Sequence, residues 1–396
     1  MKKIFHIIIL LTTTLLMACG DEPLNPDNSE KDSPTPLAPA HRNVIVYMMA
    51  ENSLSQYAQK DIDEMAEAAD CIPTDCNVVI YLDDVKSPRI YTLNRQQGLS
   101  EYITLPEQCS TNATTFQDNM DFIRRKCPAE HYGLVMWSHG SGWIPAQKKT
   151  VGIDNMQNKD NLDNGTELDI CDMKRAIRNV GLHFDWILFD VCFMQCVESD
   201  YELRDVADYI IASPAELPGD GAPYDKIMTA MMADEGAAKG IADTYFDSYK
   251  DGVGLVISVV RTAELENLLK ATSAILPDFY VTAAGINTEG IQKYCTFAYG
   301  TQWKPEYHDI GSMMNRTAST EEYYNWTAQL NRTVVVNHHT SKWATSYRSF
   351  GFEAKMTDES HIANLSIFIP NKKYEGTTDY NIRIKETEWY RDFNAE

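Results

Sequence analysis

The sequence predicts an α/β fold, in which a mostly parallel sheet carries helices on both faces. Short apolar runs rich in β-branched residues alternate with segments whose apolar residues recur at helical spacing, which is typical of strand–helix–strand units. Two of these runs end in turns with reactive side chains, at the position where open sheets place their ligands. The chain has 396 residues and is 44% hydrophobic, which is enough for a sizeable core and more than one folding unit.

The first residues are expected to lie outside the fold. Lys2 and Lys3 precede an apolar run that is too short to span a bilayer stably. The run leads into Ala18-Cys19, which resembles the lipobox of bacterial lipoproteins. We therefore expect residues 1–18 to be a lipoprotein signal peptide and Cys19 to be the lipidated first residue of the mature chain. An ordinary signal peptide is the alternative.

Lipidation at Cys19 predicts a protein anchored to the bacterial cell envelope. We expect the anchor in the outer membrane, with the protein facing the periplasm or the cell surface. Residues 19–40 are rich in Pro, Asp, Asn and Ser and show no periodicity, so they are expected to form a disordered tether. The net charge of −22 argues against nucleic acid as a partner.

Strands and helices are expected to alternate through the first 262 residues. Pro128 cannot continue the helix before it, and Gly181 suits the left-handed position that closes a helix. Short apolar runs predict strands at 43–48, 77–82, 89–93, 102–105, 133–138, 186–192, 209–213 and 254–260. Helical spacing predicts a helix ending near Ala69 and others at 115–127, 168–180, 193–206, 224–232 and 237–250.

The pattern changes after Thr262. Helices are expected at 264–276 and 320–334, a strand at 364–370 and a last segment at 380–393. Some of these elements could extend the first sheet. The chain therefore divides into an α/β domain at 41–262 and a C-terminal α+β region at 263–396 that packs on it.

Two strand ends carry the residues of a cysteine nucleophile and its base. One strand ends in Asp190-Val-Cys192, and another ends just before His139 and a glycine-rich turn. The helix expected after Cys192 would favour its thiolate through the helix dipole. The Cys and His are 53 positions apart, a layout similar to that of caspases.

Four stretches resemble the clostripain family of cysteine peptidases, which share a caspase-like fold. They are Met48-Met-Ala-Glu-Asn-Ser-Leu54, Trp137-Ser-His-Gly-Ser-Gly-Trp143, Phe189-Asp-Val-Cys-Phe-Met194, and Leu365-Ser-Ile-Phe-Ile-Pro370 followed by Trp389. The resemblance implies that residues 41–262 are a caspase-like catalytic domain. It also implies a cysteine endopeptidase that cleaves proteins or peptides after basic P1 residues, Arg or Lys, through a Cys-His dyad and an acyl-enzyme.

The same resemblance implies roles for individual residues. Cys192 would be the nucleophile and His139 its acid and base, and the N–H groups of Gly140 and Cys192 would form an oxyanion hole. Asp190 would lie in the S1 pocket, with Asp220 as a second candidate for that pocket. The loop around Asp220 departs from the family pattern, which leaves the choice between Arg and Lys open.

Members of this family can cut themselves between the histidine and cysteine motifs. The segment 144–165 offers Lys148, Lys149 and Lys159 as self-cleavage positions. The acidic run at 160–169 does not follow the EF-hand pattern, and no Cys/His spacing resembles a zinc site. We therefore predict neither a metal nor a cofactor.

Two other functions compete with this interpretation. A catalytically decayed member of the same fold could be a surface binding lipoprotein, although the intact His139/Cys192 pair argues against it. A thiol-redox protein could use Cys192 and Cys196, but the pair lacks the Cys-x-x-Cys spacing.

Overall fold

The computed structural model describes residues 34–143, 151–154, 165–282, 286–295, 298–299, 302–303, 306–346, 352–357, 359–374 and 380–395. Contacts divide the chain into residues 1–35 and a compact unit of residues 36–396, to which nearly all described residues belong. Four predicted positions, Cys19, Lys148, Lys149 and Lys159, lie outside the described residues. None of the described helices is both long and apolar enough to cross a bilayer.

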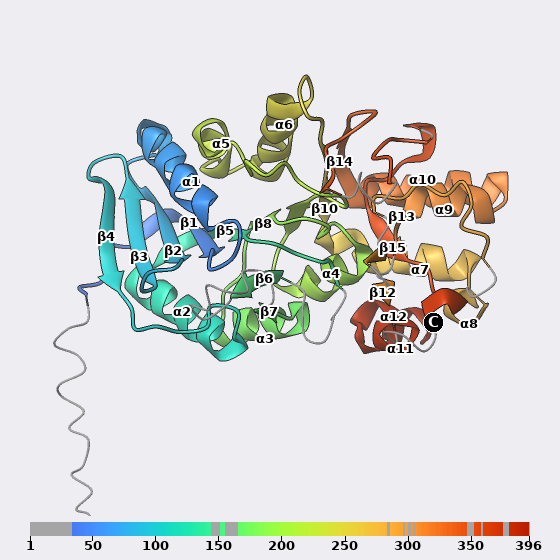
Figure 1. Ribbon diagram of the computed structural model, residues 1–396, viewed down its shortest axis with the longest axis horizontal. Coiled ribbons are helices and arrows are strands. Elements are labelled where there is room, and N and C mark those ends of the chain that lie inside the picture. Colours follow the sequence, from blue (N-terminus) through green and yellow to red (C-terminus); the bar gives the residue numbers. More distant parts are fainter. Residues whose placement is uncertain are drawn as a thin grey trace, which may run out of the picture. The chain divides into compact units, whose positions relative to one another are not determined.

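A mixed sheet forms the centre of residues 36–396 (Figure 1). In the described part of the chain it has nine strands, in the order β14-β10-β9-β8-β5-β1-β2-β3-β4. The central strands from β9 to β2 pair in parallel, and the strands outside them pair antiparallel, so the α/β prediction is confirmed. The bounds are β1 Ala40–Met49, β2 Cys76–Asp83, β3 Arg89–Asn94, β4 Gly98–Thr104, β5 Ala129–Trp137, β8 Trp186–Asp190, β9 Tyr209–Ala212, β10 Val256–Arg261 and β14 Val334–His339.

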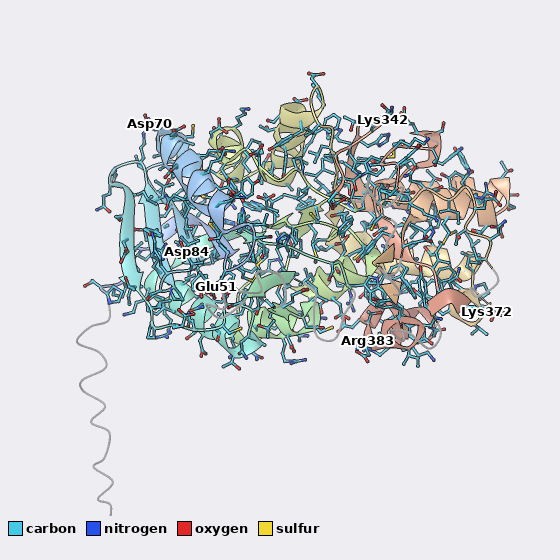
Figure 2. The ribbon with its side chains drawn as sticks, viewed as in Figure 1. Glu51, Asp70, Asp84, Lys342, Lys372 and Arg383 are labelled. Carbon is cyan, nitrogen blue, oxygen red and sulfur yellow. The ribbon has the colours of Figure 1, made fainter. Side chains whose placement is uncertain are left out.

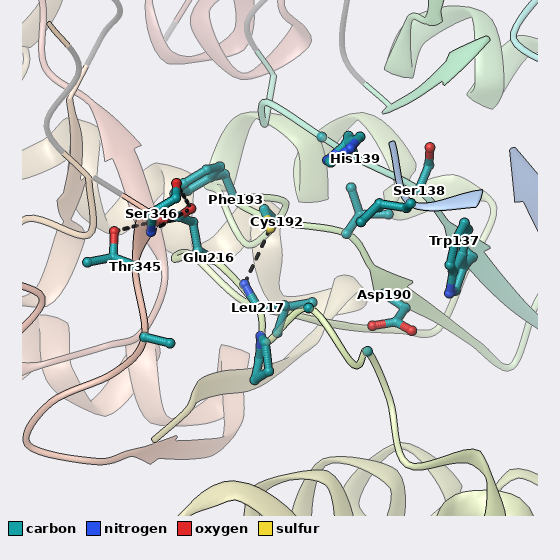
Figure 3. Close-up of a pocket in the computed structure, with 17 residues that line it drawn as sticks. Trp137, Ser138, His139, Asp190, Cys192, Phe193, Glu216, Leu217, Thr345 and Ser346 are labelled. Carbon is teal, nitrogen blue, oxygen red and sulfur yellow. Dashed lines mark hydrogen bonds between the residues drawn. The ribbon is translucent and has the colours of Figure 1, made fainter. Parts of the chain in front are cut away.

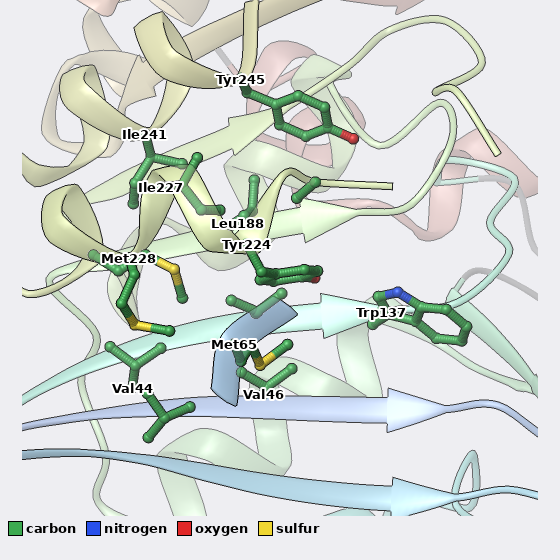
Figure 4. Close-up of a cluster of buried hydrophobic side chains, with 14 of the residues drawn as sticks. Val44, Val46, Met65, Trp137, Leu188, Tyr224, Ile227, Met228, Ile241 and Tyr245 are labelled. Carbon is green, nitrogen blue, oxygen red and sulfur yellow. The ribbon is translucent and has the colours of Figure 1, made fainter. Parts of the chain in front are cut away.

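Helices cover both faces of this sheet, because successive side chains of a strand point to opposite faces. On β1, Val44 and Val46 pack with α1, α5 and α6, whereas Ile45 and Tyr47 pack with α2 and α3. Figure 4 shows the first of these two cores, where Met65 of α1 joins side chains from α5, α6 and the strands. The bounds are α1 Ser55–Glu67, α2 Ala113–Lys126, α3 Ile170–Val180, α5 Tyr224–Met231 and α6 Ala237–Tyr249.

Capping residues explain where α2 and α3 begin and where α3 stops. The Asn112 side chain accepts hydrogen bonds from the N–H groups of Thr114 and Thr115, and the Asp169 side chain accepts one from Cys171. Gly181 ends α3 with a φ of +75°, the left-handed conformation predicted for it.

The segment after Cys192 differs from the prediction. The helix expected at 193–206 is short, because α4 spans only Val197–Glu202. The N–H of Phe193 donates to the carbonyl of Ala215 at 3.0 Å, and that of Gln195 donates to Ser213 at 3.0 Å. These bonds to the neighbouring loop replace the helical ones, so a turn rather than a helix follows the cysteine.

The region after residue 262 contributes directly to this architecture. Its strand β14 pairs with β10 at the sheet edge and was not predicted. The helix expected just before it, at 320–334, is present as α10, Thr320–Thr333. The strand expected at 364–370 is present as β15, which pairs with β13 and whose Ser366 N–H donates to Gln195 at 3.0 Å. The C-terminal strand thus supports the turn that follows Cys192.

The remaining elements complete the description. The short strands are β6 Val151–Asp154, β7 Thr166–Leu168, β11 Ala298–Tyr299, β12 Gln302–Trp303, β13 Tyr307–Asp309 and β15 Ser366–Phe368. The helices are α7 Leu265–Ile275, α8 Phe279–Thr282, α9 Ile310–Thr317, α10 Thr320–Thr333, α11 Tyr380–Arg383 and α12 Glu388–Phe393.

Candidate active site

A cavity of about 480 Å³ opens at the carboxyl ends of β5 and β8. Its lining joins His139 and Gly140, from the turn after β5, to Asp190 and Cys192, from the end of β8 (Figure 3). These four residues were expected in the site, and the pairing of β5 with β8 brings them together. Neighbouring parallel strands therefore place a thiol, an imidazole and a carboxylate around one cavity.

The Cys192 thiol lies in the turn between β8 and α4. The next residue, Phe193, has a φ of +64°, a left-handed conformation that is unfavourable for a bulky side chain. The N–H of Leu217 donates to Cys192 Sγ at 3.3 Å (Figure 3). Backbone strain in this turn is typical of functional sites, where surrounding structure holds the unfavourable conformation.

The environment of Cys192 favours the protonated thiol. Burial raises the pKa of Cys192 to about 12, and the nearby charge of Glu216 adds to this effect. The helix dipole expected to oppose it does not act at Cys192, because α4 begins only at Val197. A base must therefore take the proton before the sulfur can attack.

Both the side chain and the backbone of His139 are held by neighbouring segments. The Ser53 hydroxyl lies 2.8 Å from His139 Nε2, and the Gly152 N–H donates to the His139 carbonyl at 2.9 Å. The Asn52 amide donates to the Ser138 hydroxyl at 3.1 Å, and that hydroxyl donates to the Met49 carbonyl. The turn after β1 thus positions the imidazole. This role was not predicted, although Asn52 and Ser53 belong to one of the stretches that resemble the family.

Gly140 allows the turns after β5 and β8 to approach closely. A Cβ atom at this position would lie 2.1 Å from Val191 Cγ1 and 3.1 Å from the Cys192 carbonyl oxygen. No side chain fits there without displacing the cysteine turn.

We expect Gly140→Ala to lower the free energy of unfolding by about 1–3 kcal/mol, the usual cost of forcing an extra methyl group into packed structure. Activity should fall with it because the displaced turn carries Cys192. Urea denaturation and peptide hydrolysis would measure the two effects. Gly252→Ala is the matched control, since the nearest atom to its Cβ is 3.7 Å away. Equal stability of the two variants would contradict the close approach at Gly140.

Asp190 lies at the floor of the cavity and is only 6% exposed. Its Oδ2 accepts from the Ala222 N–H at 3.0 Å and from the Tyr224 hydroxyl at 2.9 Å, and its Oδ1 accepts from the Tyr245 hydroxyl at 3.0 Å. Burial raises the pKa of Asp190, and these three bonds oppose that rise.

A second buried carboxylate, Asp61, lies close to Asp190. Trp137 Nε1 donates to Asp61 Oδ2 at 2.7 Å, while Asp61 Oδ1 has no hydrogen-bond partner among the described residues. Burial, followed by the charge of Asp190, raises the pKa of Asp61 to about 8. A Cβ on Gly221 would meet Asp190 Oδ2 at 2.9 Å and Asp61 Oδ2 at 3.5 Å, so both carboxylates face this glycine.

Asp61 was missed in the sequence, although a signal for it was present. It lies on the buried face of α1 with Ala58, Ile62 and Met65, where an acidic residue has no packing role. Only the contact with Trp137, 76 positions away, shows why a carboxylate is placed there.

Asp220 is not among the residues that line the cavity. Its side chain is 64% exposed, and its carboxylate lies 3.2 Å from Lys60 Nζ. Glu216 from the same loop does line the cavity, and it binds a segment of the C-terminal region. Its carboxylate accepts from the Ser346 N–H at 3.2 Å and from the Ser346 and Thr345 hydroxyls.

Cys196, the second thiol of the redox alternative, is not among the residues that line the cavity. It is fully buried, and its Sγ donates to the Ser199 hydroxyl at 3.1 Å. Both Cys192 and Cys196 are free thiols.

Comparison with known proteins assigns the family. The model of the clostripain family matches residues 46–396. The chain belongs to the clostripain family. It is therefore a cysteine peptidase, and its substrates are proteins or peptides. No curated protein matches the chain.

Solved structures of this peptidase family resemble the chain over most of its length. A secreted cysteine protease from Bacteroides thetaiotaomicron, solved with an irreversible peptide inhibitor, is 27% identical, with a TM-score of 0.77 over 90% of this chain and 100% of that one. An inactive zymogen from Parabacteroides distasonis is 26% identical, with a TM-score of 0.75 over 90% of this chain and 99% of that one. A second secreted protease from Bacteroides thetaiotaomicron, "iotapain", is 21% identical, with a TM-score of 0.73 over 90% of this chain and 100% of that one, and supports the fold alone.

Proposed function

We propose that this peptidase cleaves after Arg or Lys, with Cys192 as nucleophile and His139 as general acid and base. The observation that carries the proposal is the single cavity lined by the Cys192 thiol, the His139 imidazole and the Asp190 carboxylate. A nucleophile, a proton acceptor and an anionic floor are the groups that such a reaction requires.

The reaction begins with transfer of the Cys192 proton to His139, which the raised thiol pKa makes necessary. The thiolate sulfur attacks the scissile carbonyl carbon, and the N–H groups of Gly140 and Cys192 stabilise the oxyanion. The C–N bond then breaks while His139 gives its proton to the leaving amine. Water, deprotonated by His139, hydrolyses the thioester and restores the free thiol.

The preference for a basic P1 side chain rests on two buried carboxylates. Without a cation nearby, burial favours the protonated forms of Asp190 and Asp61. A guanidinium or ammonium group entering the pocket favours their ionised forms and pairs with the charge that results. Three protein donors already bind Asp190. Asp61 does not line the cavity, but its carboxylate faces the same glycine as Asp190 and adds negative charge beside the pocket.

We expect Asp61→Asn to lower kcat/KM on Arg and Lys peptides about tenfold, equivalent to about 1.4 kcal/mol of transition-state binding. Most of the loss should appear in KM, because the substituted carboxylate acts on the P1 side chain through its charge and does not touch the scissile bond. An Ala peptide should be cleaved as before. The control is Asp63→Asn. Asp63 is an exposed residue of the same helix, and its carboxylate accepts a hydrogen bond from the Gln59 side chain. An equal loss on the Ala peptide would show that Asp61 has only a structural role.

The assay that tests the proposed function uses fluorogenic peptides ending in Arg, Lys or Ala, with His139→Ala as the inactive comparison. Cleavage of the Arg or Lys peptides that disappears in this variant supports the proposal. Silence on every peptide by a folded protein would favour the alternative, a surface binding lipoprotein with a decayed site.

We also propose, from the sequence, that Cys19 is lipidated and anchors the protein in the outer membrane through the tether 19–40. The peptidase unit at 41–262 and the C-terminal region at 263–396 would then act outside the cytoplasm, without a nucleic-acid partner. Self-cleavage at Lys148 or Lys149 stays a prediction for the segment between the two motifs. Mass spectrometry of the protein from cell envelopes would test both modifications.

A further inference from the structure

We propose that a second cavity, at the amino ends of the central strands, binds a carboxylate carried on an apolar body. This cavity has a volume of about 350 Å³, which is large enough for a small molecule or the end of a peptide. It shares none of its lining residues with the active-site cavity. The proposal therefore depends neither on the P1 preference nor on the identity of the nucleophile.

The second cavity lies at the end of the sheet opposite to the active site. Arg42 and Trp186, which line it, lie near the starts of β1 and β8. Glu51 and Asp84, which Figure 2 labels, come just after β1 and β2 and mark the other end of the strands, where the active site lies. The loop between α5 and α6, together with the first turn of α6, forms the wall that faces the strands.

Two buried donors in this cavity have no acceptor. Arg42 and Trp186 are each only 1% exposed. The Arg42 η nitrogens donate to Asp185 at 2.6 Å and to Asp234 at 3.4 Å, but its Nε has no hydrogen-bond partner among the described residues. In the same part of the chain, Trp186 Nε1 has none either. A buried donor without an acceptor is costly, so a ligand that brings an oxygen to this point is favoured.

The first turn of α6 adds further donors to the cavity. Gly236 precedes this helix with a φ of +70°, and no side chain caps it. The N–H groups of Ala237, Ala238 and Lys239 have no acceptor among the described residues, and all three residues line the cavity. A Cβ on Gly236 would meet no atom within 4 Å, so there is open space beside this turn. Free N–H groups and the helix dipole both favour an anion at such a position.

The charge left unpaired in the cavity is positive. Each of its acidic residues already has a basic partner within 2.9 Å, namely Asp185, Asp208 and Asp234. Lys239 is paired with Asp243. Arg261 lines the cavity without an ion-pair partner among the described residues, and its guanidinium carbon lies 5.9 Å from the centre of the Tyr209 ring. A carboxylate is the group that suits this guanidinium, whereas the acidic side chains that would bind a cation are already paired.

Apolar side chains complete the wall and set the rest of the ligand. They come from β10, β14 and α6, and are Val259, Val335, Val336, Ala237 and Ala238. An inorganic anion would leave this surface uncovered, whereas an aliphatic or aromatic body would bury it. A free aliphatic acid and the C-terminal residue of a peptide share this chemistry.

Binding is tested with one probe for each of these two sources. Purified protein is titrated with hexanoate or with N-acetyl-leucine, and binding is followed by ligand-observed NMR and by thermal unfolding. We expect at least one acid to bind with a Kd of about 1 mM or below and to raise Tm by about 2 °C at a tenfold excess over Kd. Hexanamide and N-acetyl-leucinamide, which lack the charge, should bind at least about tenfold more weakly.

The probes also identify the source of the ligand. Tighter binding of N-acetyl-leucine would assign the site to peptide ends, and tighter binding of hexanoate would assign it to free acids. No binding of either acid to a folded protein, or equal binding of the acids and their amides, would overturn the proposal. Because only binding is measured, this result is independent of the peptidase assay.

A matched pair of glycine variants locates the site. Gly236→Asp places a carboxylate beside the first turn of α6 and should weaken binding of the acids at least about tenfold. Aspartate is among the residues that best tolerate the left-handed conformation found there. Gly98→Asp is the control, because Gly98 on β4 has a φ of +66° and equally open surroundings but does not line the cavity. Its affinity for the acids should be unchanged.

A matched pair of arginine variants tests the unpaired charge. Arg261→Gln should weaken binding at least about threefold because it removes the guanidinium that faces the carboxylate. Arg95→Gln, at a half-exposed side chain just after β3, should have no effect. Unchanged affinity in both Gly236→Asp and Arg261→Gln would show that the acids bind elsewhere, and would overturn the proposal.

Discussion

Replacing Cys192 by alanine should reduce kcat/KM on Arg and Lys peptides by a factor of at least about 10⁴. The reaction loses the sulfur that forms the acyl-enzyme, and the remaining groups can only bind substrate and stabilise charge. Initial rates with fluorogenic peptides measure the effect, and circular dichroism checks the fold.

Cys196→Ala is the control that separates the two thiols. Its sulfur is fully buried and bonds Ser199, so this variant should keep most of the activity. Loss of activity in Cys196→Ala, with Cys192 intact and the fold preserved, would revive the thiol-redox alternative.

The second large effect is expected for Asp190→Asn, which should lower kcat/KM on Arg and Lys peptides about a hundredfold and leave an Ala peptide much less affected. A charged P1 group buried without a counter-charge costs about 3 kcal/mol. The asparagine should fold normally, because its oxygen can accept from Ala222 and Tyr224 while its amide donates to the Tyr245 hydroxyl.

Asp220→Asn is the matched control for this substitution. The Asp220 carboxylate is largely exposed and pairs with Lys60, and such surface pairs contribute little. A larger loss in Asp220→Asn than in Asp190→Asn would contradict the assignment of the pocket floor.

The parts of the fold that depend on local pattern could be predicted from the sequence. Apolar runs and helical spacing located the parallel strands, and His139 and Cys192 were expected just after the ends of two of them. The structure shows that these two strands, β5 and β8, are neighbours in the sheet. For this reason His139 and Cys192, which end neighbouring strands, could be placed around one cavity.

Features set by distant contacts could not be predicted. The turn after Cys192 has helical spacing in sequence, but its N–H groups bond to Ser213 and Ala215. Asp61 of α1 and Asp190 of β8 both face Gly221, and no local pattern reports that proximity.

The most direct test of the central claim is mass spectrometry after labelling with a thiol-reactive peptide ketone that carries arginine at P1. We expect one adduct per chain, on the peptide that contains Cys192, and little reaction with the same reagent carrying alanine. Cys71 is an exposed free thiol and reports nonspecific alkylation. Labelling that favours Cys71, or that is equal for the arginine and alanine reagents, would contradict the assignment of Cys192 as the nucleophile of a pocket for basic residues.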